Sequence, residues 1–422
     1  MQPIRGTRDL LFEDQRRFCQ VTQAAQAVAE QFGFQKLSTP ILETAALFHH
    51  TSGEASDLVS KEMFEVVSRG AGVRESSGMV LRPEGTAPVM RALLNAGLHQ
   101  HLPVKAFYEG PMFRYDRPQK GRQRQFHQVG VEWIGDSDPM ADVETIACAA
   151  TFLEKLGLKD HLTLHLNTLG DTQSRDHHRN RLIAYFQRHV QSLSEESVKR
   201  LALNPLRILD SKDEGDKALV KDAPSILNDL TPQAAAFFEG VQQGLDQLGI
   251  AYHLDDALVR GLDYYSHTTF EFTTPNLGAQ QTVLAGGRYD GLSQLMGGPA
   301  IAGVGWAAGI ERLVLLQEQT GVPVPSRPDR IAILPIGKPC THEALKLAQA
   351  LRHKACEVEV LWGDVVLGKK LKKASKQGVA TVLILGEEEL AQHKVIMKDL
   401  RTGHQEGLSL NKLDKLVQVC FS

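Results

Sequence analysis

The clearest pattern of apolar and polar positions lies between Val104 and Gly135. Two apolar-rich segments, Val104–Phe113 and Phe126–Gly135, predict the strands of a hairpin. The residues between them, 114–125, carry five basic side chains against a single acid, Asp116. The hairpin should therefore present a strongly basic loop.

The two faces of this hairpin differ in chemistry, because side chains alternate along a strand. One face carries Tyr108, Gly110, Met112 and Arg114 from the first strand, and Gln128, Gly130 and Glu132 from the second. The other face of the second strand carries Val129, Val131 and Trp133. Arginine, glutamine and glutamate beside glycines indicate a surface that forms the floor of a ligand-binding site. An ordinary surface hairpin with a solvated loop fits the same residues equally well.

The same periodicities predict the elements around the hairpin. Helices are expected at Asp14–Phe32, Ala87–Ala96 and Pro139–Leu156, strands at Phe34–Glu43, His161–Asn167, Tyr252–Val259 and Thr268–Thr273, and a glycine-rich strand leading into a helix over Ala302–Glu318. Pro40 interrupts the first of these strands. Since proline cannot donate to a strand ladder, that strand should lie at an edge, a bulge or a subunit interface.

Residues 173–224 have a different character, with charged helical segments at Arg175–Val190 and Ser194–Leu203 and little strand pattern. An inserted helical module is expected there. Its basic residues, such as Arg179, Arg181 and Arg188, fit contact with nucleic acid or, more simply, a solvated face.

The proline-rich segment Thr320–Asp329 is the clearest domain boundary. Beyond it, strands and helices alternate over residues 330–400, which predicts a small α/β domain with a mostly parallel sheet. The net charge is +4 from Asp329 to Ser422 and −7 in the rest of the chain. The basic tail is a hint of a polyanionic partner.

Three segments carry candidate chemistry. The corner Leu81–Thr86 brings together a carboxylate, a hydroxyl and backbone N–H groups, although a helix N-cap at Thr86 is the commoner meaning. Arg260–Tyr265 fits either a pocket for a planar polar group or packing tyrosines with an Arg260–Asp263 ion pair. Leu284–Asp290 adds paired glycines, which permit close approach of a ligand.

Arg312 follows a glycine-rich strand and lies in the first turns of a helix, where N–H groups and the dipole favour phosphate. A second candidate, Gly363–Lys370, satisfies the G-x-x-x-x-G-K pattern between a strand and a helix. However, Lys370 stands where Ser or Thr must hold magnesium, and Val365 and Val366 are β-branched. No nucleotide P-loop is predicted there.

Composition sets the class of protein. The length of 422 residues predicts two or three domains, and 42% apolar with 23% charged residues is typical of a globular protein. The five cysteines form no C-x-x-C pair and the sixteen histidines no H-E-x-x-H, so neither a disulfide framework nor a metal held by protein ligands is expected. The absence of an apolar leader and of a membrane-length apolar run indicates a cytoplasmic protein.

Together these motifs resemble the histidyl-tRNA synthetases, which are class II aminoacyl-tRNA synthetases. RGLDYY (Arg260–Tyr265) and AGGRYDGL (Ala285–Leu292) resemble two signatures specific to that family. Pro40–Glu43 resembles class II motif one, which builds the dimer interface. Residues 113–135 resemble motif two, and Gly303–Leu316 resembles motif three. The resemblance extends over essentially the whole chain.

The resemblance implies an α+β catalytic domain, the class II antiparallel sheet flanked by helices, over residues 1–172 and 225–322. It also implies a helical insertion at 173–224 and a C-terminal α/β anticodon-binding domain at 329–422. The implied activity is ATP-dependent ligation of L-histidine to tRNA(His) through a histidyl-adenylate, in a homodimer.

Residue roles follow from the same resemblance. The transition state places extra negative charge on the α-phosphate, so fixed cations are the main requirement. Arg114 is implied at the α-phosphate and carboxylate, Arg312 at the γ-phosphate, and Arg260 as the catalytic cation, with Mg²⁺ neutralising the pyrophosphate. The implied histidine-binding residues are Glu84, Thr86, Gln128, Glu132, Tyr264, Tyr265 and Tyr289, with Tyr265 and Tyr289 reading the imidazole.

The basic loop is implied to contact the acceptor end of tRNA, where that family usually recognises an extra 5′ guanosine. The implied contact residues are Arg117, Gln119, Lys120, Arg122 and Arg124. The basic tail suits the anticodon stem, mainly through phosphates.

One departure and two alternatives accompany the resemblance. His267 stands where the family often has glycine, and we expect its ring to face away from the pocket. A histidine-sensing regulatory subunit of ATP phosphoribosyltransferase is the nearest alternative, but such proteins typically lack the C-terminal domain and tolerate loss of the arginines kept here. The tRNA-sensor module of a translation-factor kinase would need a kinase domain, and no H-R-D or D-F-G motif is present.

Overall fold

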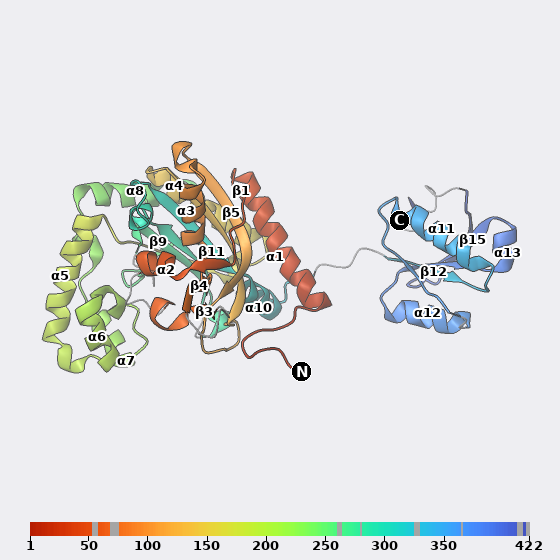
Figure 1. Cartoon of the computed structure of the whole chain (residues 1–422), viewed down its shortest axis with the longest axis horizontal. Helices are drawn as coiled ribbons and strands as arrows, with labels where there is room; N and C mark the ends of the chain where they lie inside the picture. The colour runs from red at the N-terminus through yellow and green to blue at the C-terminus, as the bar shows by residue number, and fades with distance from the viewer. Residues whose placement is uncertain are drawn as a thin grey trace. The chain divides into compact units, whose positions relative to one another are not determined.

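The computed structural model describes residues 1–52, 58–67, 76–259, 264–278, 281–324, 330–363, 366–411 and 417–418. The chain divides into two units, Met1–Val324 and Pro325–Ser422, each with its own sheet and core (Figure 1). Within the described ranges, no helix combines the length and the apolar character that a membrane span requires.

A mostly antiparallel sheet forms the centre of the first unit. Among the described residues it has eight strands in the order β1-β5-β6-β11-β10-β9-β7-β8, and parallel pairing is confined to the edge pairs β1–β5 and β7–β8. The strands are β1 (Gln35–Lys36), β5 (Val104–Phe113), β6 (Gln125–Ile134), β7 (Thr163–Thr168), β8 (His253–Leu254), β9 (Ser266–Thr273), β10 (Thr282–Arg288) and β11 (Gly303–Gly309). The predicted antiparallel sheet and its central hairpin are confirmed.

Helices cover one face of this sheet and enclose the main apolar core. They are α1 (Phe12–Gln31), α4 (Pro139–Lys155), α8 (Pro232–Gln247) and α10 (Ile310–Thr320). Val129 and Val131 of β6 point into this core, as the alternation predicted, and Phe152 of α4 stacks on Trp306 with 5.7 Å between ring centroids. The polar set of β6 therefore faces the other way.

The opposite face of the sheet packs against α3 (Thr86–Asn95) and α9 (Leu292–Leu295). A small sheet lies next to these helices, with the strand order β2-β4-β3. Its strands are β2 (Leu42–Thr44), β4 (Ser76–Leu81) and β3 (Phe64–Val67). In the chain, α2 (Ala45–Ser52) follows β2, and the short helix Leu58–Glu62 precedes β3. The strand predicted at Phe34–Glu43 is divided into β1 and β2, and each lies at the edge of its sheet, so the predicted edge position is confirmed and the continuity of the strand is not. Pro40 lies between β1 and β2, which belong to different sheets, because a proline cannot continue a ladder.

Three helices follow β7 and lie together at one side of the first unit (Figure 1). They are α5 (Thr172–Arg188), α6 (Glu195–Leu203) and α7 (Glu214–Val220). They have an apolar core of their own, which includes Leu182, Phe186 and Ile208. The strand predicted at Tyr252–Val259 was too long, since β8 comprises only His253–Leu254.

The second unit contains β12 (Ile331–Pro335), α11 (Cys340–Arg352), β13 (Val358–Val360), α12 (Leu367–Lys376), β14 (Thr381–Leu385), α13 (Glu387–Ala391), β15 (Lys394–Asp399) and β16 (Gln405–Ser409). The sheet order is β13-β12-β14-β15-β16. The predicted parallel pairing holds for β13, β12 and β14, whereas β15 and β16 extend the sheet as an antiparallel hairpin. Lys370 is buried and donates to Pro335 O at 2.8 Å, so it anchors α12 to β12.

A buried ion pair joins the main sheet to α4. Arg288, at the end of β10, and Asp142 of α4 are both fully buried, with 3.0 Å between Arg288 Nε and Asp142 Oδ2. Arg288 also donates to the carbonyl oxygens of Asp136 at 2.9 Å and Asp138 at 3.2 Å. The pair fixes the start of α4 against the strand that leads into Tyr289.

We expect Arg288→Met to lower the free energy of unfolding of the first unit by about 3–5 kcal/mol, because it leaves the Asp142 carboxylate buried without a counter-charge. The double variant Arg288→Met/Asp142→Leu should recover much of that loss. Urea denaturation followed by circular dichroism measures both. A single variant as stable as the wild type would show that the pair is not an anchor.

Candidate active site

The polar face of the hairpin is the floor of a cavity of about 1010 Å³. Strand register places the lining residues in rows across the sheet: Gln128 of β6 is opposite Gly309 of β11, and Ala307 of β11 is opposite Ala285 of β10. Small side chains in the middle of the floor leave room for a ligand. The polar face of the strands therefore lines a cavity, whereas Arg117, Gln119 and Lys120 of the loop are exposed to solvent.

Glu84 and Thr86 form the corner where the chain enters α3. Glu84 accepts hydrogen bonds from the backbone N–H groups of Thr86 at 2.6 Å and Ala87 at 2.9 Å. The carboxylate of Glu84, and not the hydroxyl of Thr86, thus satisfies the helix N-terminus. Burial raises the pKa of Glu84 above its ordinary value, although these N–H donors and Arg114 act to lower it.

Thr86 has another partner, since its hydroxyl donates to Glu132 Oε1 at 2.7 Å. The Tyr289 hydroxyl donates to the other oxygen, Oε2. Glu132 is 1% exposed, and burial raises its pKa to about 8. Residues from three distant segments therefore meet on one buried carboxyl group.

Gly305 of β11 lies directly opposite Glu132 in the strand register. A Cβ atom at this position would lie 2.0 Å from Glu132 Oε2, which no side chain can tolerate. Gly305 lines the cavity, so the missing side chain leaves the Glu132 carboxyl just below the floor.

Three tyrosines close one end of the cavity. Tyr264, Tyr265 and Tyr289 are buried, with ring centroids 4.9 Å apart for Tyr264–Tyr265 and 6.0 Å apart for Tyr264–Tyr289. Burial raises the pKa of Tyr264 and Tyr289 well above the ordinary value, so both keep their hydroxyl protons at neutral pH. Arg175 of α5 donates to the carbonyl of Tyr265 at 2.7 Å, which ties this end to the helical segment.

Gln128 lines the cavity with one polar atom unused. Its Oε1 is buried and has no hydrogen-bond partner among the residues that the structure describes. Leaving such an acceptor unsatisfied costs about 1–3 kcal/mol. The atom is therefore available to a ligand that donates a hydrogen bond.

The other end of the cavity is cationic. Arg114 donates from Nε to Pro83 O at 2.9 Å, and Arg312 donates from Nη1 to Thr282 O at 2.7 Å and from Nε to Gly121 O at 3.3 Å. Burial, followed by the charges of Arg122 and Arg114, lowers the pKa of Arg312. Guanidinium groups gathered in this way suit a multiply charged phosphate.

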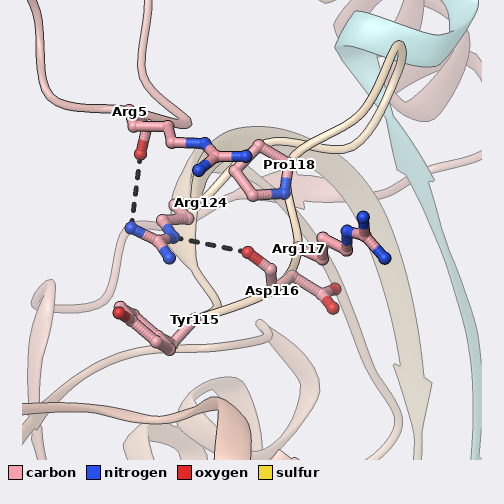
Figure 2. Close-up of a pocket in the computed structure, with 6 residues that line it drawn as sticks. All are labelled: Arg5, Tyr115, Asp116, Arg117, Pro118 and Arg124. Carbon is pink, nitrogen blue, oxygen red and sulfur yellow. Dashed lines mark hydrogen bonds between the residues drawn. The ribbon is translucent and has the colours of Figure 1, made fainter.

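The predicted tRNA-contact residues separate into two groups around the loop. Gln119 and Arg122 line the large cavity, whereas Arg117 and Arg124 line a second cavity of about 430 Å³ (Figure 2). Lys120 is not among the described lining residues of either cavity. Arg122 pairs with Asp116, and its Nη2 lies 3.6 Å from Glu62 Oε1.

The sequence did not predict a contact beside the phosphate end between His127 and Glu311, which we call the His127–Glu311 clamp. Glu311, in the first turn of α10, accepts from the backbone N–H of His127 at 2.9 Å and lies 2.8 Å from its Nδ1. The pair connects the hairpin to the helix that carries Arg312. Local sequence patterns could not predict this contact, because the partners are 184 residues apart. The available indication was the glycine-rich strand before α10, which marked the start of that helix as a candidate site.

Two predicted features lie at or near undescribed residues. Arg260, the predicted catalytic arginine, and Asp263, its alternative ion-pair partner, lie outside the described residues. His267 is described, and its ring packs on Phe237 with 4.7 Å between centroids. His267 is not among the described lining residues of the large cavity, so its ring faces away as expected.

Comparison with known proteins decides the family. Residues 6–313 match the family model for histidyl-tRNA synthetase, and residues 330–419 match that for an anticodon binding domain. The chain belongs to the histidyl-tRNA synthetase family. It is 49% identical to a histidine–tRNA ligase of Rhodospirillum rubrum, over 99% of this chain and 98% of that protein, and 47% identical to one of Gluconobacter oxydans with the same coverage.

Solved structures agree with this assignment. The apo histidyl-tRNA synthetase of S. aureus is 31% identical with a TM-score of 0.82, over 99% of each chain. A Bacillus halodurans protein described as an ATP phosphoribosyltransferase regulatory subunit/histidyl-tRNA synthetase has a TM-score of 0.65 over 92% of this chain and 98% of its own. At 22% identity that likeness shows a shared fold alone.

The buried Glu132 carboxyl makes the stability of this synthetase-family protein depend on pH. Its pKa of about 8 in the folded state exceeds the ordinary 4.5, so unfolding releases its proton between these values. The free energy of unfolding should therefore fall as the pH rises from about 4.5 to about 8, by roughly 3–5 kcal/mol for this group.

Denaturation of the wild type and Glu132→Gln at intervals across this range measures the effect. The fluorescence of Trp133 and Trp306 reports on the first unit in a Trp362→Phe background, since Trp362 belongs to the second unit. The variant should lose less stability than the wild type as the pH rises. Equal losses in both proteins would contradict the buried, proton-binding Glu132.

Proposed function

We propose that this chain joins L-histidine to tRNA(His) in two steps, with a histidyl-adenylate between them. The observation that carries the proposal is one cavity with two chemically distinct ends. One end has buried carboxyl, hydroxyl and phenol groups that suit a small polar amino acid, and the other has clustered guanidinium groups that suit a triphosphate. Family membership over nearly the whole chain supports the same activity.

Histidine would occupy the end lined by Glu84, Thr86 and Gln128. Glu84 supplies negative charge for the ammonium group, and the unused Gln128 Oε1 supplies an acceptor. Tyr265 and Tyr289 would read the imidazole ring, with Tyr264 packed beside them and Glu132 beneath. A site that hydrogen-bonds both ring nitrogens rejects analogues that lack one of them more strongly than shape alone does.

ATP would occupy the cationic end. In activation, a histidine carboxylate oxygen attacks the α-phosphorus of ATP, a new P–O bond forms, and pyrophosphate leaves. Arg114 would stabilise the charge that develops on the α-phosphate, and Arg312 would hold the γ-phosphate. The hydrogen bonds to Thr282 O and Gly121 O use two of the five guanidinium N–H groups of Arg312, so the others can donate to that phosphate. The family resemblance gives Arg260 the role of a further catalytic cation.

Mg²⁺ would accompany the ATP. Within the described ranges, no three His, Cys, Asp or Glu side chains gather as a metal site. Glu271 and Glu311 line the same cavity as Arg312, and Mg²⁺ commonly takes one or two carboxylates together with substrate phosphates. Both oxygens of Glu311 already accept from the His127 N–H. The ion would therefore be held mainly by the ATP phosphates, as the sequence predicts, and would neutralise negative charge on the pyrophosphate.

In the second step, a hydroxyl of the terminal adenosine of tRNA attacks the histidyl carbonyl and AMP leaves. The loop residues Arg117, Gln119, Lys120, Arg122 and Arg124 would receive the acceptor end. The second unit would bind the anticodon region, mainly through phosphate contacts. We expect the reaction to take place in the cytoplasm.

Histidine-dependent exchange of pyrophosphate into ATP tests the activity directly. The wild type should catalyse exchange, and Arg114→Gln should slow it by at least about 100-fold because one cation at the reacting phosphate is lost. Arg188→Gln, on the exposed side of α5, is the matched control and should retain the wild-type rate. A folded wild type that binds histidine without exchange would favour a histidine-sensing regulatory subunit.

We also propose that the chain is a homodimer, formed through the sheet β2-β4-β3. Leu42 is 48% exposed and Met79 is 36% exposed, while Val80, on the opposite face, is fully buried. An apolar sheet face open to water favours a partner, and the family resemblance of Pro40–Glu43 to motif one points to a second copy.

Leu42→Asp should therefore shift the protein from dimer to monomer at micromolar concentration, because it places a charge in the apolar face. Analytical ultracentrifugation measures the change. Leu254→Asp, which alters a leucine of similar exposure on β8, is the control and should leave the dimer intact. A dimer that survives Leu42→Asp would place the interface elsewhere.

A further inference from the structure

We propose that the N-terminal segment Ile4–Thr7 is a positioning clasp for the loop between β5 and β6, residues 114–124, which we call the acceptor loop. The inference rests on the proposed function, in which the loop receives the acceptor end of tRNA. It adds a role for a segment that lies far from the class II motifs in the sequence.

Backbone hydrogen bonds join the two segments. Gly6 O accepts from Arg124 N at 2.7 Å and from Gln125 N at 3.3 Å, at the point where the loop enters β6. Arg5 O accepts from Arg124 Nη1 at 3.5 Å (Figure 2). The segment is itself a tight turn, in which Thr7 N and Thr7 Oγ1 both donate to Ile4 O, at 2.9 and 2.8 Å.

Gly6 lies against both limbs of the acceptor loop. Its φ of +90° is one that other residues rarely adopt. A Cβ atom there would lie 2.8 Å from Arg124 Cγ and 3.0 Å from Pro118 Cγ. Pro118 and Arg124 belong to the outgoing and returning limbs, so a side chain at position 6 would separate the segment from the loop.

The clasp sets the position of Arg124. This side chain lies over the Tyr115 ring, 3.9 Å from guanidinium carbon to centroid, and donates from Nε to Asp116 O at 3.3 Å (Figure 2). Both contacts depend on the Arg124 backbone, which Gly6 holds. On the opposite side, Glu62 O accepts from Tyr115 N at 2.6 Å, so the loop is held from two directions.

The phosphate end has anchors outside the clasp. Arg114 Nε donates to Pro83 O and Arg312 Nη1 to Thr282 O, which lie in other segments. Each arginine also has one contact to the acceptor loop, because Arg124 O accepts from Arg114 N at 2.9 Å and Gly121 O accepts from Arg312 Nε at 3.3 Å. Loss of the clasp should therefore slow the transfer of histidine to tRNA more than it slows histidine activation. A residue that merely supports folding would affect both steps alike.

The test compares Gly6→Val with Gly249→Val in the full-length protein. Gly249 also has a positive φ, of +64°, but a Cβ atom added there would meet none of the described atoms within 4 Å. We expect Gly6→Val to lower kcat/KM for tRNA about tenfold, the factor that losing one or two hydrogen bonds produces. Pyrophosphate exchange should fall clearly less than tRNA charging in Gly6→Val, and should stay within about twofold of the wild type in Gly249→Val.

A second measurement needs no substrate. Trypsin cleavage after Lys120 or Arg122 in the acceptor loop should become several times faster in Gly6→Val, and in a variant lacking residues 2–7, than in the wild type or Gly249→Val. Unchanged cleavage, or equal losses of exchange and tRNA charging, would overturn the clasp. A wild type without exchange would instead refute the proposed function, while the cleavage comparison would still decide the clasp.

Discussion

The organisation of the cavity depends on one buried carboxyl group. Glu132 lies on the central strand β6, is 1% exposed, and receives hydrogen bonds from Thr86 at the start of α3 and Tyr289 after β10. Removing a carboxyl group from water is unfavourable unless its oxygens are satisfied, so these elements are constrained to meet there. Gly305 completes the arrangement, because a side chain at this position of β11 would collide with the carboxyl group. The hydrogen-bonding requirement of one carboxyl group thus fixes the relative positions of β6, β11, the start of α3 and the residues after β10.

The cationic end follows a different rule. In the part of the chain that the structure describes, the hydrogen bonds that orient Arg114 and Arg312 go to the backbone carbonyl groups of Pro83, Thr282 and Gly121. A neutral acceptor orients a guanidinium group and leaves its positive charge to stabilise the developing charge on a phosphate. The carboxyl end and the guanidinium end share one floor of small residues. An amino acid and a triphosphate bound at the two ends would meet in the middle of that floor.

Local periodicity predicted much of this arrangement. The alternation along Phe126–Gly135 separated Glu132 and Gln128 from Val129 and Val131, and the structure keeps that division. Contacts between residues far apart in the chain decided what local patterns left open. The capping alternative for Thr86 fails because its hydroxyl donates to Glu132, 46 residues away, while Glu84 satisfies the start of α3. The predicted strand Phe34–Glu43 divides at Pro40 between two sheets. The His127–Glu311 clamp and the Gly6 contact join residues far apart in the chain, and no local pattern carries information about such pairs.

The most direct test of a cavity organised by Glu132 is the titration of its carboxyl group. Carbon-13 NMR of the protein labelled at the glutamate side-chain carboxyl carbon, compared with the same spectra of Glu132→Gln, identifies its signal. We predict a midpoint near pH 8 in the free protein, far above the ordinary 4.5, and a shift of that signal when L-histidine is added. A midpoint near the ordinary value, with no response to L-histidine, would contradict the central role given to this group.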